Sequence, residues 1–180
     1  MHEKILLFFG FVREYKGLRY LIEAMPEISS RIADVKLMIV GDFGSEENKE
    51  TYINLIKEKN VEKYIDICDG YIPDRDIEKF FAACDLVVLP YVDATQSGIV
   101  QIAYGFEKPV VVTNVGGLPD VVEDGKTGYV VEACNSGELA GAVIKYFQED
   151  REEKFVKNVE AEAYRFSWER MTEIIERLYR

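Results

Sequence analysis

The sequence alternates short apolar runs with longer amphipathic segments, and this alternation limits the possible folds more than any other feature. Runs rich in Val, Ile and Leu that are apolar at nearly every position are typical of strands buried on both faces of a parallel sheet. They lie at residues 4–10, 35–41, 64–68, 85–90 and 108–113. Segments of helical periodicity separate them, so we predict an α/β fold: a Rossmann-like, doubly wound parallel sheet of about six strands with helices on both faces.

The last third of the chain differs from the rest. Residues 114–127 are rich in glycine and predict tight loops, and a short strand is expected at residues 128–132. Three helical segments then follow, at residues 138–148, 151–165 and 168–179, with Ser167 as the expected cap of the last. No repeat or linker interrupts the chain, so we predict that residues 1–180 form one domain.

Charge and composition exclude several classes of partner. The formal net charge of −11 argues against broad binding to nucleic acid or anionic lipid, which needs a positive surface. No apolar run is long enough to span a membrane, and the N-terminal run lacks the features of a signal peptide. Three widely spaced cysteines, Cys68, Cys84 and Cys134, cannot all pair with one another, so a reducing cytoplasm is the simplest location. The only histidine is His2, so no histidine general base is expected.

The loop "GFVREYKG" follows the first predicted strand and carries Gly10, Arg13 and Lys16. It is neither a nucleoside-triphosphatase phosphate loop nor a three-glycine dinucleotide loop. Cations beside a helix start oppose the helix macrodipole, and a bound anion would reverse that penalty. The residues alone leave two readings open, an anion site and a pair of solvated side chains.

The loop "YVDATQSG" follows the fourth predicted strand and precedes an apolar helix. Polar side chains and free backbone amides at a helix start suit a phosphate, and they equally suit an ordinary helix cap. Both readings stay open here. The residues concerned are Thr95, Gln96, Ser97 and Gly98.

Taken in order, several motifs give the chain a family resemblance. The segments "GFVREYKGLRYLIEAM", "VKLMIVGD", "DGYIPDRDIEKFFAACDLVVLPY", "SGIVQIAYGFEKPVVVTNVGGLPDVVEDGKTGYVV" and "FSWERM" cover nearly all of it. Together they resemble the C-terminal domain of family 4 glycosyltransferases, which have the two-Rossmann GT-B architecture. The resemblance implies a domain that binds a nucleoside-diphosphate sugar as co-substrate. It further implies hexosyl transfer with retention of anomeric configuration in polysaccharide or glycoconjugate biosynthesis, without a metal ion or other cofactor, alongside an N-terminal acceptor-binding domain or subunit.

The resemblance also implies roles for individual residues. Lys16 matches a family lysine that contacts the diphosphate. The family arginine that directly follows the first glycine is replaced by Phe11, and Arg13, two residues on, is the candidate substitute. Gly10 is a candidate on its residue type alone, because glycine permits a tight turn or a close approach of a ligand. Backbone contacts to the base are implied for Tyr71, Ile72 and Pro73.

Two family glutamates, seven residues apart, contact the donor sugar and the ribose hydroxyls. A gapless count places Ala94 and Ile102 at these positions, and a shift of one residue gives Asp93 and Gln101. One residue turns a helix by about 100 degrees, so the two registers present different side chains to the ligand. We prefer Asp93 and Gln101 and leave the other register open. The amides of Ser97, Gly98 and Ile99 are available to phosphates in either register.

Two other functions compete with glycosyl transfer by this chain. The loss of both glutamates favours a non-catalytic nucleotide-sugar-binding or regulatory remnant of the same domain. A receiver-like or nicotinamide-binding α/β domain is the other alternative, and the missing three-glycine motif argues against the nicotinamide cofactor. As a donor-binding half, the isolated chain is expected to bind nucleotide sugar weakly and to turn over little, because acceptor positioning lies elsewhere.

Overall fold

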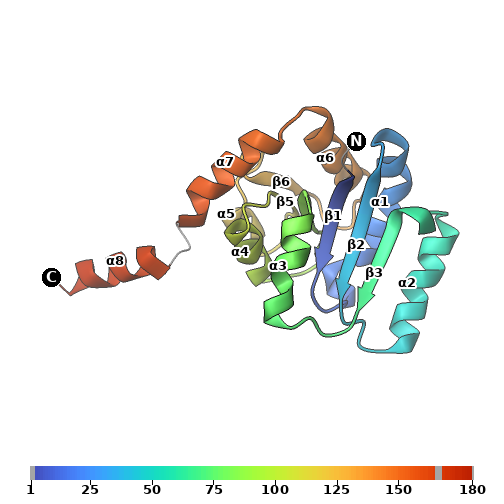
Figure 1. Ribbon diagram of the computed structural model, residues 1–180, viewed down its shortest axis with the longest axis horizontal. Helices are drawn as coiled ribbons and strands as arrows, with labels where there is room; N and C mark the ends of the chain where they lie inside the picture. The colour runs from blue at the N-terminus through green and yellow to red at the C-terminus, as the bar shows by residue number, and fades with distance from the viewer. Residues whose placement is uncertain (1–2, 165–167, 180) are drawn as a thin grey trace.

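The computed structural model describes residues 3–164 and 168–179, and its centre is one parallel sheet of six strands (Figure 1). The strands lie in the order β3-β2-β1-β4-β5-β6. Their bounds are β1 Lys4–Phe9, β2 Val35–Gly41, β3 Ile65–Asp69, β4 Leu86–Leu89, β5 Val110–Thr113 and β6 Gly128–Val131. The predicted Rossmann-like α/β fold is therefore confirmed.

Helices cover both faces of the sheet, and each face has its own apolar core. On one face the core joins β-strand side chains to α1 Leu18–Arg31, α2 Glu46–Glu58 and α6 Ser136–Gln148, and Phe155 also packs into this core. On the other face four helices contribute: α3 Asp74–Ala83, α4 Gly98–Gly105, α5 Leu118–Val121 and α7 Glu152–Ala163. The last helix, α8 Trp168–Leu178, extends away from the sheet (Figure 1).

Two sequence expectations differ from the structure, and two residues that the sequence analysis named fall outside it. Residues 64–68 were expected to form a fully buried strand, but β3 lies at the sheet edge and only Ile65 in it is buried. The short helix α5 occupies part of the segment expected to be loop, because Pro119 in its first turn suits a helix start. Ser167 and His2 lie outside the described residues. Within those residues, no helix combines the length and the apolar character that crossing a bilayer requires.

Strand order changes direction at β1, and this determines where the loops meet. β1 pairs with β2 on one side and with β4 on the other, and all pairings are parallel. The carboxyl ends of β1 and β4 therefore lie side by side, at the point where ligands bind in open α/β sheets. The two loops singled out in the sequence leave these two strands.

Candidate functional site

Lys16 is positioned by a single 3₁₀ turn, η1 (Glu14–Lys16), between β1 and α1. The turn ends at Gly17, whose φ of +66° lies in the left-handed region that favours glycine. A side chain at Gly17 would also collide with the carbonyl oxygen of Pro90. This close approach places Lys16 directly beside the chain that leaves β4.

The Lys16 side chain is buried and has no counter-charge. Its residue is 9% exposed, and within residues 3–164 and 168–179 it forms no ion pair or side-chain hydrogen bond. Its Nζ lies 5.6 Å from the ring centroid of Tyr91 and 2.8 Å from where a Cβ on Gly10 would stand. Burial lowers the pKa of Lys16 below its usual value, and the positive charge of Arg13 lowers it further. A buried cation that nothing in the described chain neutralises is suited to an anionic ligand.

The N-terminus of α4 faces the same space. Ser97 caps the helix, and its hydroxyl accepts a hydrogen bond from the Ile99 amide at 3.3 Å. The Val100 amide donates to the Ser97 carbonyl, whereas the Gly98 amide has no hydrogen bond within the described part of the chain. Free amides and the positive end of the helix dipole favour a bound anion.

Lys16 and the α4 N-terminus line one open cleft of about 640 Å³. The loop after β5 supports its wall, because the Gly117 amide donates to the Thr95 carbonyl at 2.8 Å. The lining residues are Tyr15, Lys16, Tyr91, Asp93, Ala94, Thr95, Gln96, Ser97, Gly98, Ile99 and Ile102. Asp93 is the only carboxylate and Lys16 the only cation among these lining residues, so the cleft offers one buried positive charge to an anion.

A second, smaller cavity of about 90 Å³ lies at the carboxyl ends of β1, β2 and β3. Two exposed aromatic residues are among those that line it, Phe11 at 51% exposure and Tyr71 at 72%. Gly10 lines this cavity and also lies beside the Lys16 Nζ of the larger cleft. The small apolar cavity and the cleft that contains the Lys16 ammonium group therefore adjoin at Gly10.

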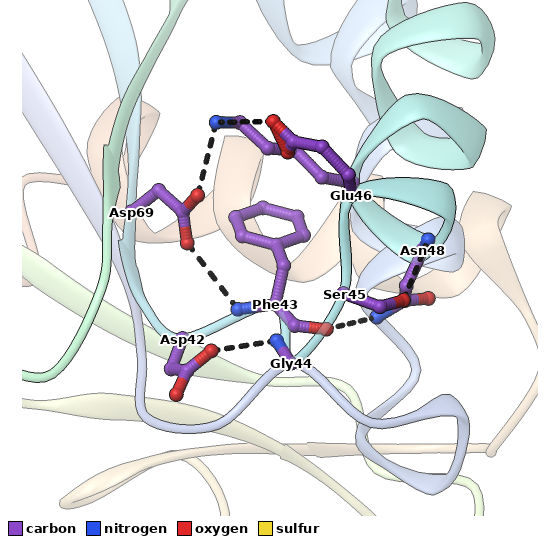
Figure 2. A network of polar contacts seen from close by, with 8 residues as sticks. Asp42, Phe43, Gly44, Ser45, Glu46, Asn48 and Asp69 are labelled. Carbon is purple, nitrogen blue, oxygen red and sulfur yellow. Dashed lines mark hydrogen bonds and ion pairs between the residues drawn. The ribbon is translucent and has the colours of Figure 1, made fainter.

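Arg13 points to a different part of the carboxyl edge. Its guanidinium lies against Gly44 in the loop after β2, with its Cζ 5.6 Å from the ring centroid of Phe11. Figure 2 shows two contacts within that loop and to the end of β3: the Asp42 carboxylate accepts a hydrogen bond from the Gly44 amide at 2.6 Å, and the Asp69 carboxylate accepts one from the Phe43 amide at 3.4 Å.

Further contacts fix the same loop to α2. The side-chain amide of Asn48 donates to the Phe43 carbonyl at 2.8 Å, and Lys49 forms an ion pair with Asp69 at 2.9 Å. Arg13 therefore rests on a loop that is held by contacts from both α2 and β3. It is exposed, unlike Lys16.

The structure brings together most of the predicted site residues and leaves three apart. Gly10, Tyr71 and Ile72 line the small cavity, while Pro73 caps α3 and lines neither space. Arg13 lines neither space, and Gln101 is exposed on α4 outside the lining. Asp93 lines the cleft, as do Ala94 and Ile102 of the alternative register. The predicted residues gathered in the cleft are Lys16, Asp93, Thr95, Gln96, Ser97, Gly98 and Ile99.

Sequence reasoning missed two aromatic residues of the cleft, Tyr15 and Tyr91. Their rings meet edge-on with centroids 6.3 Å apart, and each residue is adjacent in sequence to a strand end or to Lys16 within one of the two quoted loops. That adjacency was the available signal. No cluster of three His, Cys, Asp or Glu side chains that could hold a metal ion occurs in residues 3–164 and 168–179.

Comparisons with known proteins identify the family of the chain. A family model described as "Glycosyl transferases group 1" matches residues 3–149. The chain belongs to the group 1 glycosyltransferases. The resemblance noted in the sequence is thus confirmed at the level of this family.

Individual relatives cover the chain but are longer than it. D-inositol 3-phosphate glycosyltransferase of Corynebacterium aurimucosum is 29% identical over 99% of this chain, which spans 43% of that protein. Among solved structures, Anabaena HepE in complex with UDP has a TM-score of 0.84 at 24% identity, covering 99% of this chain and 49% of that one. The C-terminal domain of the group 1 family protein LpcC from Francisella tularensis has a TM-score of 0.78 at 22% identity, covering 90% of this chain and 84% of that one. These structural matches support the GT-B-type Rossmann fold.

Proposed function

We propose that residues 1–180 form the donor-binding domain of a glycosyltransferase that moves a hexosyl group from a nucleoside-diphosphate sugar to an acceptor hydroxyl. One observation carries the proposal: the buried, unpaired Lys16 faces a cleft that also holds the N-terminus of α4. A diphosphate supplies the negative charge that this pair of features lacks.

The adjoining apolar cavity supports the nucleoside half of the proposed donor. A planar base fits a small apolar space between exposed aromatic rings better than it fits the charged cleft. Gly10 lies at the boundary of the small cavity and the cleft. Because it has no side chain, the proposed donor could pass over it, with the base in the cavity and the diphosphate in the cleft. Tyr71, Ile72 and neighbouring Pro73 keep their proposed role as backbone contacts to the base.

In the proposed mechanism Lys16 and the α4 amides stabilise charge as it develops. The bond between the anomeric carbon and the diphosphate oxygen breaks, and its electron pair leaves with the diphosphate. Lys16 neutralises that charge, and Ser97 and Gly98 amides orient the leaving group. Retention requires the acceptor oxygen to attack on the face that the diphosphate leaves, where a phosphate oxygen is the nearest group to take the acceptor proton. Arg13 is the proposed second cation, and no metal ion is needed in this scheme.

The acceptor side is proposed to lie outside this chain, in an N-terminal domain or a separate subunit. The share of the Corynebacterium relative that this chain spans, 43%, supports this division. The helix α8 also supports it, because its exposed apolar stripe suits a contact with another domain or subunit. The stripe is formed by Met171, Ile174, Ile175 and Leu178. The chain alone is then expected to bind donor weakly and to transfer little, and a cytoplasmic location stays a prediction.

A second candidate function is a non-catalytic nucleotide-sugar-binding module. The observation that favours it is the presence of Ala94 and Ile102 in the cleft, neither of which offers a carboxylate to a sugar or ribose hydroxyl. Glycosyl transfer by the chain together with its acceptor half would remove this candidate.

A thermal-shift screen tests the proposed function. We expect the melting temperature of the chain to rise with UDP, GDP or ADP, or with one of their sugar conjugates, because a ligand that binds only the folded state stabilises it by about 2.7 kcal/mol at 100 times its Kd. The free nucleosides, which lack the diphosphate, serve as the control and are expected to give a much smaller shift. Failure of every diphosphate to raise the melting temperature at millimolar concentration would contradict the proposal.

A further inference from the structure

Tyr91 lies between the two parts of the cleft that are proposed to bind diphosphate. Its ring centroid is 5.6 Å from the Lys16 Nζ, and its hydroxyl oxygen is 3.2 Å from the hydroxyl oxygen of Ser97, the cap of α4. Tyr91 therefore contacts both Lys16 and the N-terminus of α4. Only 3% of its surface is exposed, so the ring is held inside the wall of the cleft.

The backbone on both sides of Tyr91 is anchored. Its carbonyl accepts a hydrogen bond from the Thr113 hydroxyl at 2.5 Å, at the end of β5. The next amide, of Val92, donates to the Tyr15 carbonyl at 2.7 Å. The Tyr15 ring then meets the Tyr91 ring edge-on at 78°. In this position the Tyr91 ring has its face toward Lys16 and its hydroxyl toward the N-terminus of α4.

The hydroxyl groups of Tyr91 and Ser97 together have one hydrogen-bond donor that their mutual hydrogen bond does not use. Each hydroxyl carries one proton, and the bond between them uses one of the two. The Ser97 oxygen already accepts from the Ile99 amide, so that interaction uses no hydroxyl proton. Whichever residue donates within the pair, the remaining proton is available to an oxygen of an anion in the cleft.

We infer that Tyr91 is a positioning residue that couples the Lys16 cation to the N-terminus of α4, so that both act on the same anion. Its ring supports the uncompensated ammonium group through a cation–π contact. Its hydroxyl fixes the rotamer of Ser97 and shares a proton with the ligand. The inference rests on the proposed function, because it assumes a diphosphate in this cleft.

The experiment compares Tyr91→Phe with the wild-type chain by calorimetric titration of UDP and of inorganic pyrophosphate. Phenylalanine keeps the ring beneath Lys16 and removes the hydroxyl. We expect the Kd for both probes to rise about three- to tenfold, the usual range for one hydrogen bond. Tyr104→Phe is the matched control. Tyr104 is a buried residue of α4, and its hydroxyl donates a hydrogen bond to the Thr127 hydroxyl at 2.7 Å, away from the cleft. Its Kd is expected to equal that of the wild type.

Ser97→Ala and the double variant decide whether the two hydroxyls act as a pair. We expect Ser97→Ala to weaken binding, and the double variant to bind more tightly than the product of the two single losses predicts. Purely structural effects would lower the melting temperatures of Tyr91→Phe and Tyr104→Phe alike and change neither Kd.

Three results would overturn the inference: an unchanged Kd in Tyr91→Phe, an equal loss in Tyr104→Phe, or independent losses from Tyr91 and Ser97. In the first case, loss of binding in Lys16→Met would leave the proposed function intact while the role of Tyr91 fails. Absence of UDP and pyrophosphate binding by the wild-type chain would overturn both.

Discussion

Lys16 and Arg13 lie three residues apart in one loop, yet the Lys16 side chain is buried and the Arg13 side chain is exposed. Lys16 is buried beside Tyr91 with no counter-charge in the described chain, and its pKa is lowered mainly by that burial. Arg13 is exposed and lies on the loop after β2, against Gly44. Burying an unpaired charge costs stability, whereas an exposed guanidinium costs little. The difference favours Lys16 as the main contact of the proposed diphosphate and Arg13 as a weaker, secondary one.

The carboxylates near Arg13 and near Lys16 differ in the same way as the two cations. Near Arg13, the carboxylates of Asp42 and Asp69 are already occupied by backbone amides and by Lys49. Near Lys16, the cleft is lined by hydroxyls, amides and apolar side chains, with Asp93 as its one carboxylate. The predictions below test whether this contrast holds, beginning with the largest expected effect.

Replacing Lys16 by methionine is expected to remove most of the affinity for UDP. A hydrogen bond to a charged group contributes about 1.5–3 kcal/mol, which corresponds to a rise in Kd of roughly 10- to 150-fold. Because the buried charge is removed, the melting temperature without ligand should stay the same or rise. Calorimetry and thermal unfolding measure the two effects. Lys145→Met is the control, since Lys145 also lies over an aromatic ring, that of Tyr129, but outside the cleft.

Replacing Gly17 by alanine is expected to destabilise the fold and weaken UDP binding, because it pushes η1 away from Pro90. The control is Gly125→Ala, at a φ of +72° with no atom within 4 Å of the added Cβ. Both variants carry the left-handed strain of about 1–2 kcal/mol, and Gly17→Ala adds an overlap that typically costs about 1–3 kcal/mol. Denaturant unfolding compares them. Equal losses of stability in the two variants would show that the approach to Pro90 is not needed.

Replacing Arg13 by alanine is expected to raise the Kd for UDP only about two- to fivefold, the effect of one exposed charge near a helix start. The loss should shrink as salt is added, since exposed charges are screened. Arg31→Ala, at the opposite end of α1, is the control and should change nothing. A loss as large as that of Lys16→Met would mean that Arg13 moves into the cleft when ligand binds, and the contrast between the two cations would fail.

Replacing Lys49 by methionine is expected to lower the melting temperature slightly and to leave the UDP Kd unchanged. The hydrogen bond from Lys49 is the main reason that the pKa of Asp69 lies below its usual 3.8. A lowered carboxylate pKa stabilises the fold above the usual value, and this contribution disappears as the pH falls through the folded-state value. The difference in melting temperature between wild type and Lys49→Met should therefore be present at about pH 7 and shrink as the pH falls below the usual carboxylate value of 3.8. A change in UDP affinity would contradict the separation of the two regions.

The fold was predictable because its signal is local. The apolar runs and the helical periodicity between them specify strands, helices and a parallel sheet, whatever the contacts at the site. The edge position of β3 was not predictable in this way, because the number of neighbours of a strand depends on the order of the whole sheet. Hence residues 64–68 were expected to be more buried than they are.

The site was predictable only in part, for the same reason. Lys16 and Ser97 follow strand ends, so their meeting at the carboxyl edge follows from the topology. The direction of Arg13 depends on the loop after β2, which lies about thirty residues further along the chain. The part played by Tyr91 depends on contacts with Tyr15, Ser97 and Thr113 that no spacing in the sequence reveals. Whether Gln101 or Ile102 faces the cleft depends on where α4 begins, and a rotation of one residue decides it.

The pH dependence of UDP binding tests most directly whether the buried, unpaired Lys16 is the diphosphate ligand. The pKa of Lys16 in the free chain lies below the usual lysine value of 10.5, and a bound anion raises it again. We therefore expect the affinity for UDP to fall, and binding to take up a proton, as the pH rises from about 7 to about 10. Over the same range the free energy of unfolding of the ligand-free wild type should rise relative to that of Lys16→Met, because only in the wild type does the unfolded state hold a proton at residue 16 that the folded state lacks. The part of each pH dependence that is due to Lys16 should be absent from Lys16→Met. Identical pH profiles for the wild type and Lys16→Met would contradict the account.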